Sequence, residues 1–139
     1  MSDWQEPESV RFMLDDCTTW AIVGLSGDPT RTAYSIAALL QGRGKRIVPI
    51  HPDAPTVLDE QGYPTLADVP FPIDVVDVFR RSEAAGEFAD QAVAIGAKAV
   101  WFQLGVVDTA AFDRTVAAGV PMVMDTCPAI EWRRRPLGR

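Results

Sequence analysis

The sequence predicts an α/β protein with a single domain: a doubly wound, five-stranded parallel sheet with helices on both faces. Two observations carry this prediction. Apolar strand-like runs alternate with helix-like segments five times along the chain. The runs are continuously apolar, which indicates strands covered on both faces, as in parallel sheets. Right-handed crossovers then favour an order in which the first strand is central.

The first half of the chain predicts an N-terminal helix, two strands and the helix that connects them. Residues 8–16 mix apolar side chains with acids and predict a short capping helix. We expect strands at residues 20–24 and 46–50. Apolar side chains at helical spacing predict that residues 32–41 form a helix that packs on the sheet.

The second half opens with an irregular excursion over residues 53–72, which contains four prolines and at most one helical turn at 65–69. The alternation then resumes, with strands expected at 73–79, 99–104 and 120–124 and helices at 82–95 and 108–118. We therefore divide the chain into a capping helix (1–17), the α/β domain (18–132) and a loosely held basic tail (133–139).

Composition excludes several classes of partner. The net charge of −6 argues against a broad nucleic-acid interface, which needs an excess of basic side chains. No apolar run approaches the ~18 residues that indicate a membrane span. The acidic, polar N-terminus is not a signal peptide, and the two distant cysteines are expected to be reduced thiols. We therefore expect a cytoplasmic protein without a membrane partner.

The stretch over residues 21–31 is the strongest functional signal. It predicts a buried strand, a glycine loop containing Gly24 and Ser26, and the start of a helix. This strand–loop–helix arrangement is the one with which α/β domains bind phosphate. The dinucleotide fingerprint G-x-G-x-x-G is only partly present, and His51 stands where a ribose-binding acid is expected. The Walker and G-x-S-x-G motifs are absent, and one histidine with two cysteines forms no metal-binding cluster.

Other candidate residues follow the predicted strands. Arg31 lies at a helix start, where the dipole disfavours a cation unless an anion shares the site; a solvated arginine is the alternative. Arg80 is expected at the same edge, and Tyr34 either leans over this site or packs on the sheet. Gln103 ends an apolar strand and is followed by Leu104-Gly105, a lip without bulk, which favours contact between backbone and ligand. Cys127 is a candidate nucleophile without a nameable base, so a partly buried thiol is the simpler expectation.

Six segments spread over about residues 18–132 carry a family resemblance: IVGLS (22–26), VPIHP (48–52), DVVDVFRR (74–81), AIGAK (94–98), WFQLG (101–105) and VMDTCP (123–128). With Pro29, Arg31 and Tyr34, these segments resemble the stand-alone CoA-binding proteins of bacteria. Those are Rossmann-like domains related to the CoA-binding domain of the succinyl-CoA synthetase α subunit. The synthetase's second domain, with its phosphohistidine, has no counterpart here, so no ligase activity is carried over.

The resemblance implies that CoA or an acyl-CoA binds along the carboxyl edge of the sheet. Its phosphates would be held by Gly24, Ser26 and Arg31. The nucleotide would be bordered by His51 and Pro52. The adenine and pantetheine path would be lined by Val78, Phe79 and Arg80. The far side would be closed by Gln103 and Gly105.

These observations leave three functional hypotheses. The first is a non-catalytic CoA or acyl-CoA binding protein that acts as a sensor, carrier or partner subunit. The second is an enzyme, either an NAD(P)-dependent oxidoreductase or a CoA-dependent acyl transferase that uses Cys127. The third is an interaction module without a ligand. It is motivated by Asp53 and Thr126, which occupy positions where the family often carries cations.

Overall fold

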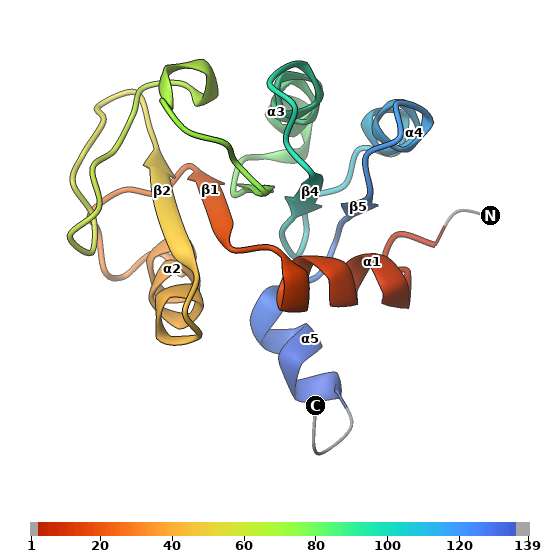
Figure 1. Cartoon of the computed structure of the whole chain (residues 1–139), viewed down its shortest axis with the longest axis horizontal. Helices are drawn as coiled ribbons and strands as arrows, with labels where there is room; N and C mark the ends of the chain where they lie inside the picture. Colours follow the sequence, from red (N-terminus) through yellow and green to blue (C-terminus); the bar gives the residue numbers. More distant parts are fainter. Residues whose placement is uncertain (1–2, 136–139) are drawn as a thin grey trace.

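The structure, a computed structural model, describes residues 3–135 and confirms the predicted α/β architecture (Figure 1). All five strands are parallel and follow the order β2-β1-β3-β4-β5, so β1 lies inside the sheet and β3 occupies the middle. The strands are β1 (Thr19–Val23), β2 (Arg46–Ile50), β3 (Val75–Val78), β4 (Ala99–Phe102) and β5 (Met122–Val123).

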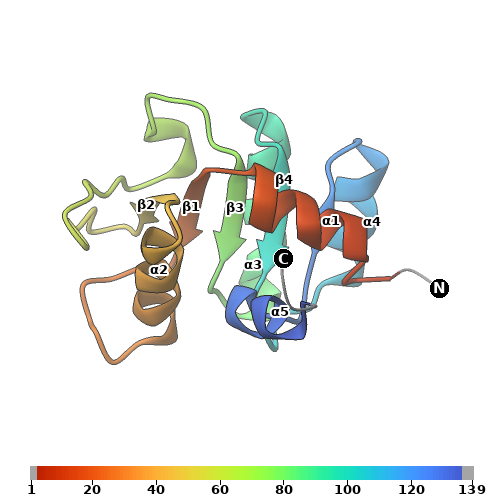
Figure 2. The same cartoon turned by 60° about the horizontal axis from the view of Figure 1, so that its bottom comes forward.

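Helices cover both faces of the sheet (Figures 1 and 2). One face is covered by η2 (Leu66–Asp68), α3 (Ser82–Ala94) and α4 (Thr109–Ala117). The other face is covered by α1 (Pro7–Arg11), the π-helical turn η1 (Phe12–Asp16), α2 (Thr32–Gly42) and α5 (Pro128–Arg134). Within residues 3–135, no helix is long and apolar enough to cross a membrane.

The sheet divides the core into two buried layers. Successive side chains of a strand point to opposite faces. In β3, Val76 and Val78 pack under α3 and α4, whereas Val75 packs on the opposite face. That second layer is centred on Trp20 and Trp101, whose ring centroids are 5.8 Å apart. All four residues of β3 are buried, which explains why its sequence is nearly continuous in apolar residues.

The C-terminal part differs from the sequence prediction. Pro128 begins a helix, α5, that the sequence reading left unassigned. Arg133 and Arg134 lie inside this helix, and Arg135 forms an ion pair with Asp15, Nη1 to Oδ1, at 2.6 Å. The expectation of a loosely held tail is therefore wrong for residues 133–135, while residues 136–139 lie outside the described part. The short amphipathic pattern around Trp132, interrupted by arginines, hid the helix.

The strand order creates a crevice at the carboxyl edge of the sheet. From β1 the chain crosses to β2 on one side, and from β2 it returns to β3 on the other side of β1. The loops that leave β1 and β3 therefore diverge over opposite faces. Such a switch point is where open α/β sheets bind ligands.

Candidate ligand-binding edge of the sheet

Gly24 brings the end of β1 against the end of β3. Its φ of +94° favours glycine, and a Cβ added there would lie 2.8 Å from the carbonyl oxygen of Phe79 and 3.5 Å from Cδ of Arg80. On its other side, the Gly24 N–H donates to the carbonyl oxygen of Ile50 at 2.8 Å. Any larger residue at position 24 would push the β1 loop away from β3.

The loop that follows Gly24 is held by its own hydrogen bonds. Asp28 Oδ1 accepts from the N–H of Thr30 at 2.9 Å and from its hydroxyl at 2.7 Å, and these bonds lower the pKa of Asp28. The Asp28 N–H donates to Oγ of Ser26 at 3.3 Å. Arg31 occupies the N-cap of α2 without a side-chain hydrogen bond to the first turn. The first-turn amides of α2 are thus not capped by Arg31 and suit an anion.

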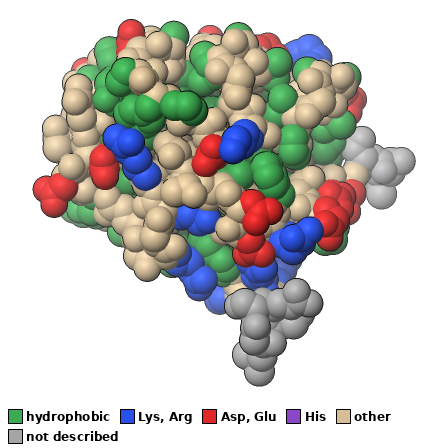
Figure 3. Space-filling view, viewed as in Figure 1, with side chains coloured by type: hydrophobic (Ala, Val, Ile, Leu, Met, Phe, Trp, Pro, Cys, Tyr) green, Lys and Arg blue, Asp and Glu red, His purple; other side chains and the backbone are tan. Residues whose placement is uncertain are grey.

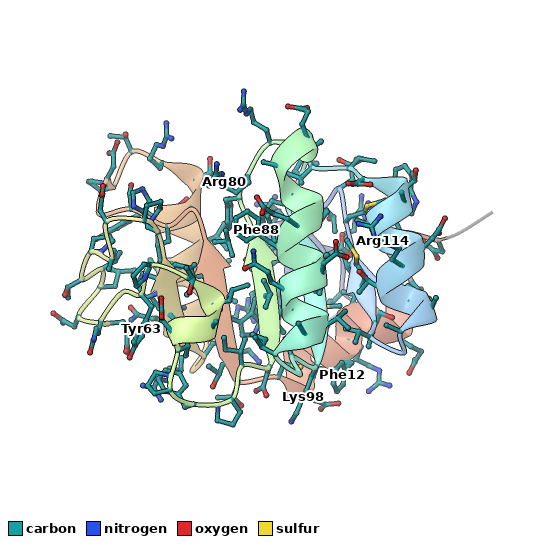
Figure 4. All side chains as sticks on the ribbon, turned by 90° about the horizontal axis from the view of Figure 1, so that it is seen from above. Phe12, Tyr63, Arg80, Phe88, Lys98 and Arg114 are labelled. Carbon is teal, nitrogen blue, oxygen red and sulfur yellow. The ribbon has the colours of Figure 1, made fainter. Side chains whose placement is uncertain are left out.

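A pocket of about 380 Å³ opens beside this loop. Its walls come from the start of α2, the ends of β3 and β4, and the start of α5. The lining residues are Thr32, Phe79, Arg80, Gln103, Leu104, Val106 and Cys127. The Arg80 guanidinium also lies 5.8 Å from the ring of Phe88 on α3 (Figure 4). The pocket therefore combines an apolar wall, one amide, one thiol and one cation.

Arg31 and Arg80 are two exposed cations at this edge of the sheet. Within residues 3–135, neither has a carboxylate oxygen within 4.0 Å. Arg114 and Arg135, by contrast, are paired with Asp90 and Asp15. The two cations at the edge are consequently available to an anionic ligand.

Gln103 connects the pocket to a buried carboxyl group. Its side chain lines the pocket although the residue is only 4% exposed. Its Nε2 donates to Oδ1 of Asp77 at 2.5 Å. Asp77 is completely buried in β3, and this burial raises its pKa to about 8 against the opposing effect of the Gln103 hydrogen bond. The carboxyl group that Gln103 contacts is therefore neutral at pH 7.

The backbone of Gln103 is engaged within the protein. Its N–H donates to the carbonyl oxygen of Val78 at 3.3 Å, and its own carbonyl accepts from the N–H of Val106 at 2.8 Å. The side chain of Gln103 therefore faces the pocket, and the expected contact between a ligand and the backbone of the Leu104-Gly105 lip stays a prediction.

The remaining predicted residues lie around the pocket rather than in its lining. His51 and Pro52 follow β2 on the far side of the Gly24 loop, and His51 Nδ1 accepts the N–H of Asp53 at 3.1 Å. Tyr34 packs against the core layer of α2, and Val78 is wholly buried, so the structure places Val78 in the core beneath the edge. Gly105 donates its N–H to Oδ1 of Asp125 at 2.8 Å.

The sequence reading missed several residues of this edge. Thr32 and Val106 line the pocket although the sequence interpretation did not name them. Asp77 did carry a signal, because a carboxylate interrupts a run of valines in a strand that both faces bury. Thr126 is buried and donates its hydroxyl to Glu131, which takes its side chain away from the pocket.

A second cavity, of about 510 Å³, lies between α1 and α5. Its lining includes three arginines, and each is paired with an acid: Arg11 with Glu8, Arg134 with Glu131 and Arg135 with Asp15. Figure 3 shows acidic and basic side chains mixed over this part of the surface. The charges are locally balanced, so this cavity lacks the cations available at the sheet edge.

Comparisons with known proteins point to one family. A family model described as a CoA binding domain matches residues 18–133. The uncharacterised protein YneT of Bacillus subtilis strain 168 is 34% identical over 107 residues, which cover 77% of this chain and 79% of that protein. A hypothetical protein from Pyrococcus horikoshii OT3 is 31% identical with a TM-score of 0.86, over 96% of this chain and 98% of that one.

A Thermus thermophilus protein, cell-free ID.343, is 29% identical with a TM-score of 0.83, over 91% of this chain and 96% of that one. The Pyrococcus and Thermus structures match more than nine-tenths of this chain and of their own length. The fold is therefore shared over nearly the whole of each of these two structures. Together with the family match over residues 18–133, these findings show that the chain belongs to the CoA-binding domain family.

Proposed function

We propose that this chain binds CoA or an acyl-CoA at the carboxyl edge of its sheet and performs no reaction on it. It would serve as a carrier, a sensor or a partner subunit in the cytoplasm. The observation that carries the proposal is the pocket of about 380 Å³ beside Gly24, in a chain of the CoA-binding domain family. Both cysteines, Cys17 and Cys127, are free thiols, which supports a reducing compartment.

The phosphate groups of the ligand would bind on the β1 side of the crevice. Arg31 and Arg80 supply cations there, and the first turn of α2 supplies backbone N–H groups. Gly24 allows the close approach that joins these groups into one surface. CoA carries its negative charge on the nucleotide, so this end of the ligand meets the cations.

The pantetheine arm and any acyl group would extend into the pocket itself. Phe79, Leu104 and Val106 provide an apolar wall, and Gln103 provides one buried polar group. This pairing matches an arm in which methylene groups alternate with amides. An apolar pocket with a few placed polar groups is the usual form of a small-molecule site.

Acyl transfer through Cys127 is the second candidate, because this thiol lines the same pocket. Within residues 3–135, however, no side chain forms a hydrogen bond with Cys127 that would activate it as a nucleophile. His51 lies beyond the Gly24 loop and bonds to Asp53 instead. Full transfer activity in a Cys127→Ser variant would exclude this candidate.

Calorimetric titration with CoA and acetyl-CoA tests the proposed function. We expect binding in the wild type and about tenfold weaker binding in Arg80→Ala, because one charged contact to phosphate is lost. Arg81→Ala is the matched control: Arg81 is exposed, precedes α3 and does not line the pocket, so its loss should leave affinity unchanged. Absence of binding at millimolar ligand, or equal losses in both variants, contradicts the proposal.

A further inference from the structure

Asp77 is an isolated carboxyl group in the middle of the sheet. It shares the α2 and α5 face of β3 with Val75 and lies in register with Ile22 on β1 and Trp101 on β4. Its Oδ1 is bonded to Gln103, whereas Oδ2 is buried and has no hydrogen-bond partner within residues 3–135. Buried polar atoms without partners are rare and costly, so this one calls for a physical reason.

No charged group compensates for this burial. The titratable side chains on the elements packed over this face are Cys17 after η1, Tyr34 in α2, and Cys127 and Glu131 at α5. Within the described chain, none of them forms a hydrogen bond or ion pair with Asp77. Desolvation therefore keeps the carboxyl group neutral at pH 7, with a pKa of about 8.

Gln103 leaves one amide atom for the pocket. Its N–H, its carbonyl and its Nε2 are all bonded within the protein, and its side chain lines the pocket. The Oε1 atom has no partner among residues 3–135 and is not among the buried unpartnered atoms, so it reaches the pocket. Gln103 is thus a nine-tenths buried polar side chain with a free atom at the ligand site.

The two protonation states of Asp77 require opposite orientations of this amide. A carboxylate only accepts hydrogen bonds, so it holds Nε2, which is the arrangement in this structure, and leaves Oε1 for the pocket. A neutral carboxyl group must place its own O–H on an acceptor, and Oε1 of Gln103 is the neighbouring one. Turning the amide by 180° satisfies this O–H and presents the NH₂ group to the pocket, with almost no change in shape.

We propose that Asp77 is a positioning residue that sets the polarity of the ligand site through Gln103. With Asp77 protonated, Gln103 presents its NH₂ group and binds a carbonyl oxygen of the ligand, from the pantetheine amides or the acyl thioester. With Asp77 ionised, Gln103 presents Oε1 and this hydrogen bond is lost. The inference rests on the proposed CoA function. It adds that the site recognises a carbonyl group of the ligand, and that this recognition weakens as the pH rises.

The test is calorimetric titration with acetyl-CoA from pH 7.5 to 9.5, a range that lies well above the pKa of the ligand's phosphate groups, about 6. We expect wild-type affinity to fall about three- to tenfold across the range, the effect of one hydrogen bond. Asp77→Asn keeps the shape, pairs with Gln103 in either orientation and cannot ionise, so its affinity should not change with pH. Cys127→Ser alters the pocket lining, so its absolute affinity is not the control; its affinity should still fall by the wild-type factor between pH 7.5 and pH 9.5, which separates Asp77 from the pocket thiol.

Nuclear magnetic resonance supplies a readout that needs no variant. The ¹³C signal of the Asp77 carboxyl group should titrate at a higher pH in the presence of acetyl-CoA, since the ligand stabilises the protonated form. A purely structural Asp77 would leave this titration unmoved. Measurable binding that is independent of pH, or that falls equally in wild type and Asp77→Asn, overturns the inference and leaves the proposed function standing. No binding at any pH overturns both.

Discussion

Asp74 and Asp77 lie three residues apart along the same strand segment, yet their surroundings are opposite. Asp74, at the amino edge of the sheet, accepts the N–H groups of Thr18 and Thr19 at 2.8 and 3.1 Å and lies 3.5 Å from Lys98 Nζ. Asp77, toward the carboxyl edge, has one hydrogen-bond partner within residues 3–135, Gln103. Burial alone would raise the pKa of Asp74, but the hydrogen bonds from Thr19 and Thr18 and the nearby Lys98 outweigh it, so the pKa of Asp74 is lowered. Burial raises the pKa of Asp77 to about 8.

The two edges of the sheet therefore differ in how completely their polar groups are bonded within the protein. At the amino edge, Asp74 joins the start of β1 to β3, and its bonds are complete. At the carboxyl edge, polar groups are left incomplete: Asp77 has a free oxygen, and Arg80 has no carboxylate within 4.0 Å among residues 3–135. Arg80 is exposed and open to an anionic ligand, and Asp77 contacts Gln103, which lines the pocket, so the groups suited to ligand binding lie at this edge.

The largest expected effect is on the pH dependence of stability. Asp77 binds a proton more tightly in the folded state, so its stabilising effect is complete below pH 3.8 and is lost as pH rises toward about 8. In that window its contribution to the free energy of unfolding falls by up to about 1.4 kcal/mol per pH unit. Asp77→Asn removes this slope. Urea unfolding of both proteins from pH 5 to 9 measures it, and parallel curves would contradict the raised pKa.

Gly24→Ala should destabilise the fold by about 2–3 kcal/mol and weaken CoA binding more than tenfold. The added Cβ would approach the Phe79 carbonyl oxygen to 2.8 Å, at a φ of +94° that already disfavours alanine. Gly44→Ala is the matched control, with a φ of +84° and nothing within 4 Å of the new Cβ. It should cost only about 1 kcal/mol and leave binding intact. Equal effects at both glycines would show that the close approach of Gly24 to Phe79 is not important for stability or for binding.

Asp74→Ala should lower the free energy of unfolding by about 2 kcal/mol at pH 7 without affecting CoA binding, because two backbone N–H groups lose a charged acceptor. The lowered pKa of Asp74 means that this contribution is present above pH 3.8 and disappears as pH falls below it. Asp90→Ala, which removes only an exposed ion pair with Arg114, should cost about 0.5 kcal/mol. A loss of ligand affinity in Asp74→Ala would contradict the statement that the amino edge of the sheet takes no part in ligand binding.

The sequence predicted the sheet because its strands are continuous apolar runs, and it predicted the crevice because the alternation of strands and helices implies one. Arg80 and Gln103 were predictable in the same way, since Arg80 follows an apolar strand and Gln103 lies at the end of one, whereas Phe79 was named only through the family resemblance. The hydrogen bond between Gln103 and Asp77 was not, because it joins two strands whose relative register the sequence does not encode locally. The helix after Cys127 escaped prediction since its seven residues offer barely two turns of periodicity.

Hydrogen–deuterium exchange with and without CoA tests most directly whether the carboxyl edge of the sheet is the ligand site. If CoA binds at the carboxyl edge, its binding should slow amide exchange in three segments, residues 24–34, 79–82 and 103–107. Exchange at Thr18, Thr19 and Asp74, on the opposite edge, should not change. Protection confined to the cavity between α1 and α5, or spread equally over both edges, would contradict this prediction.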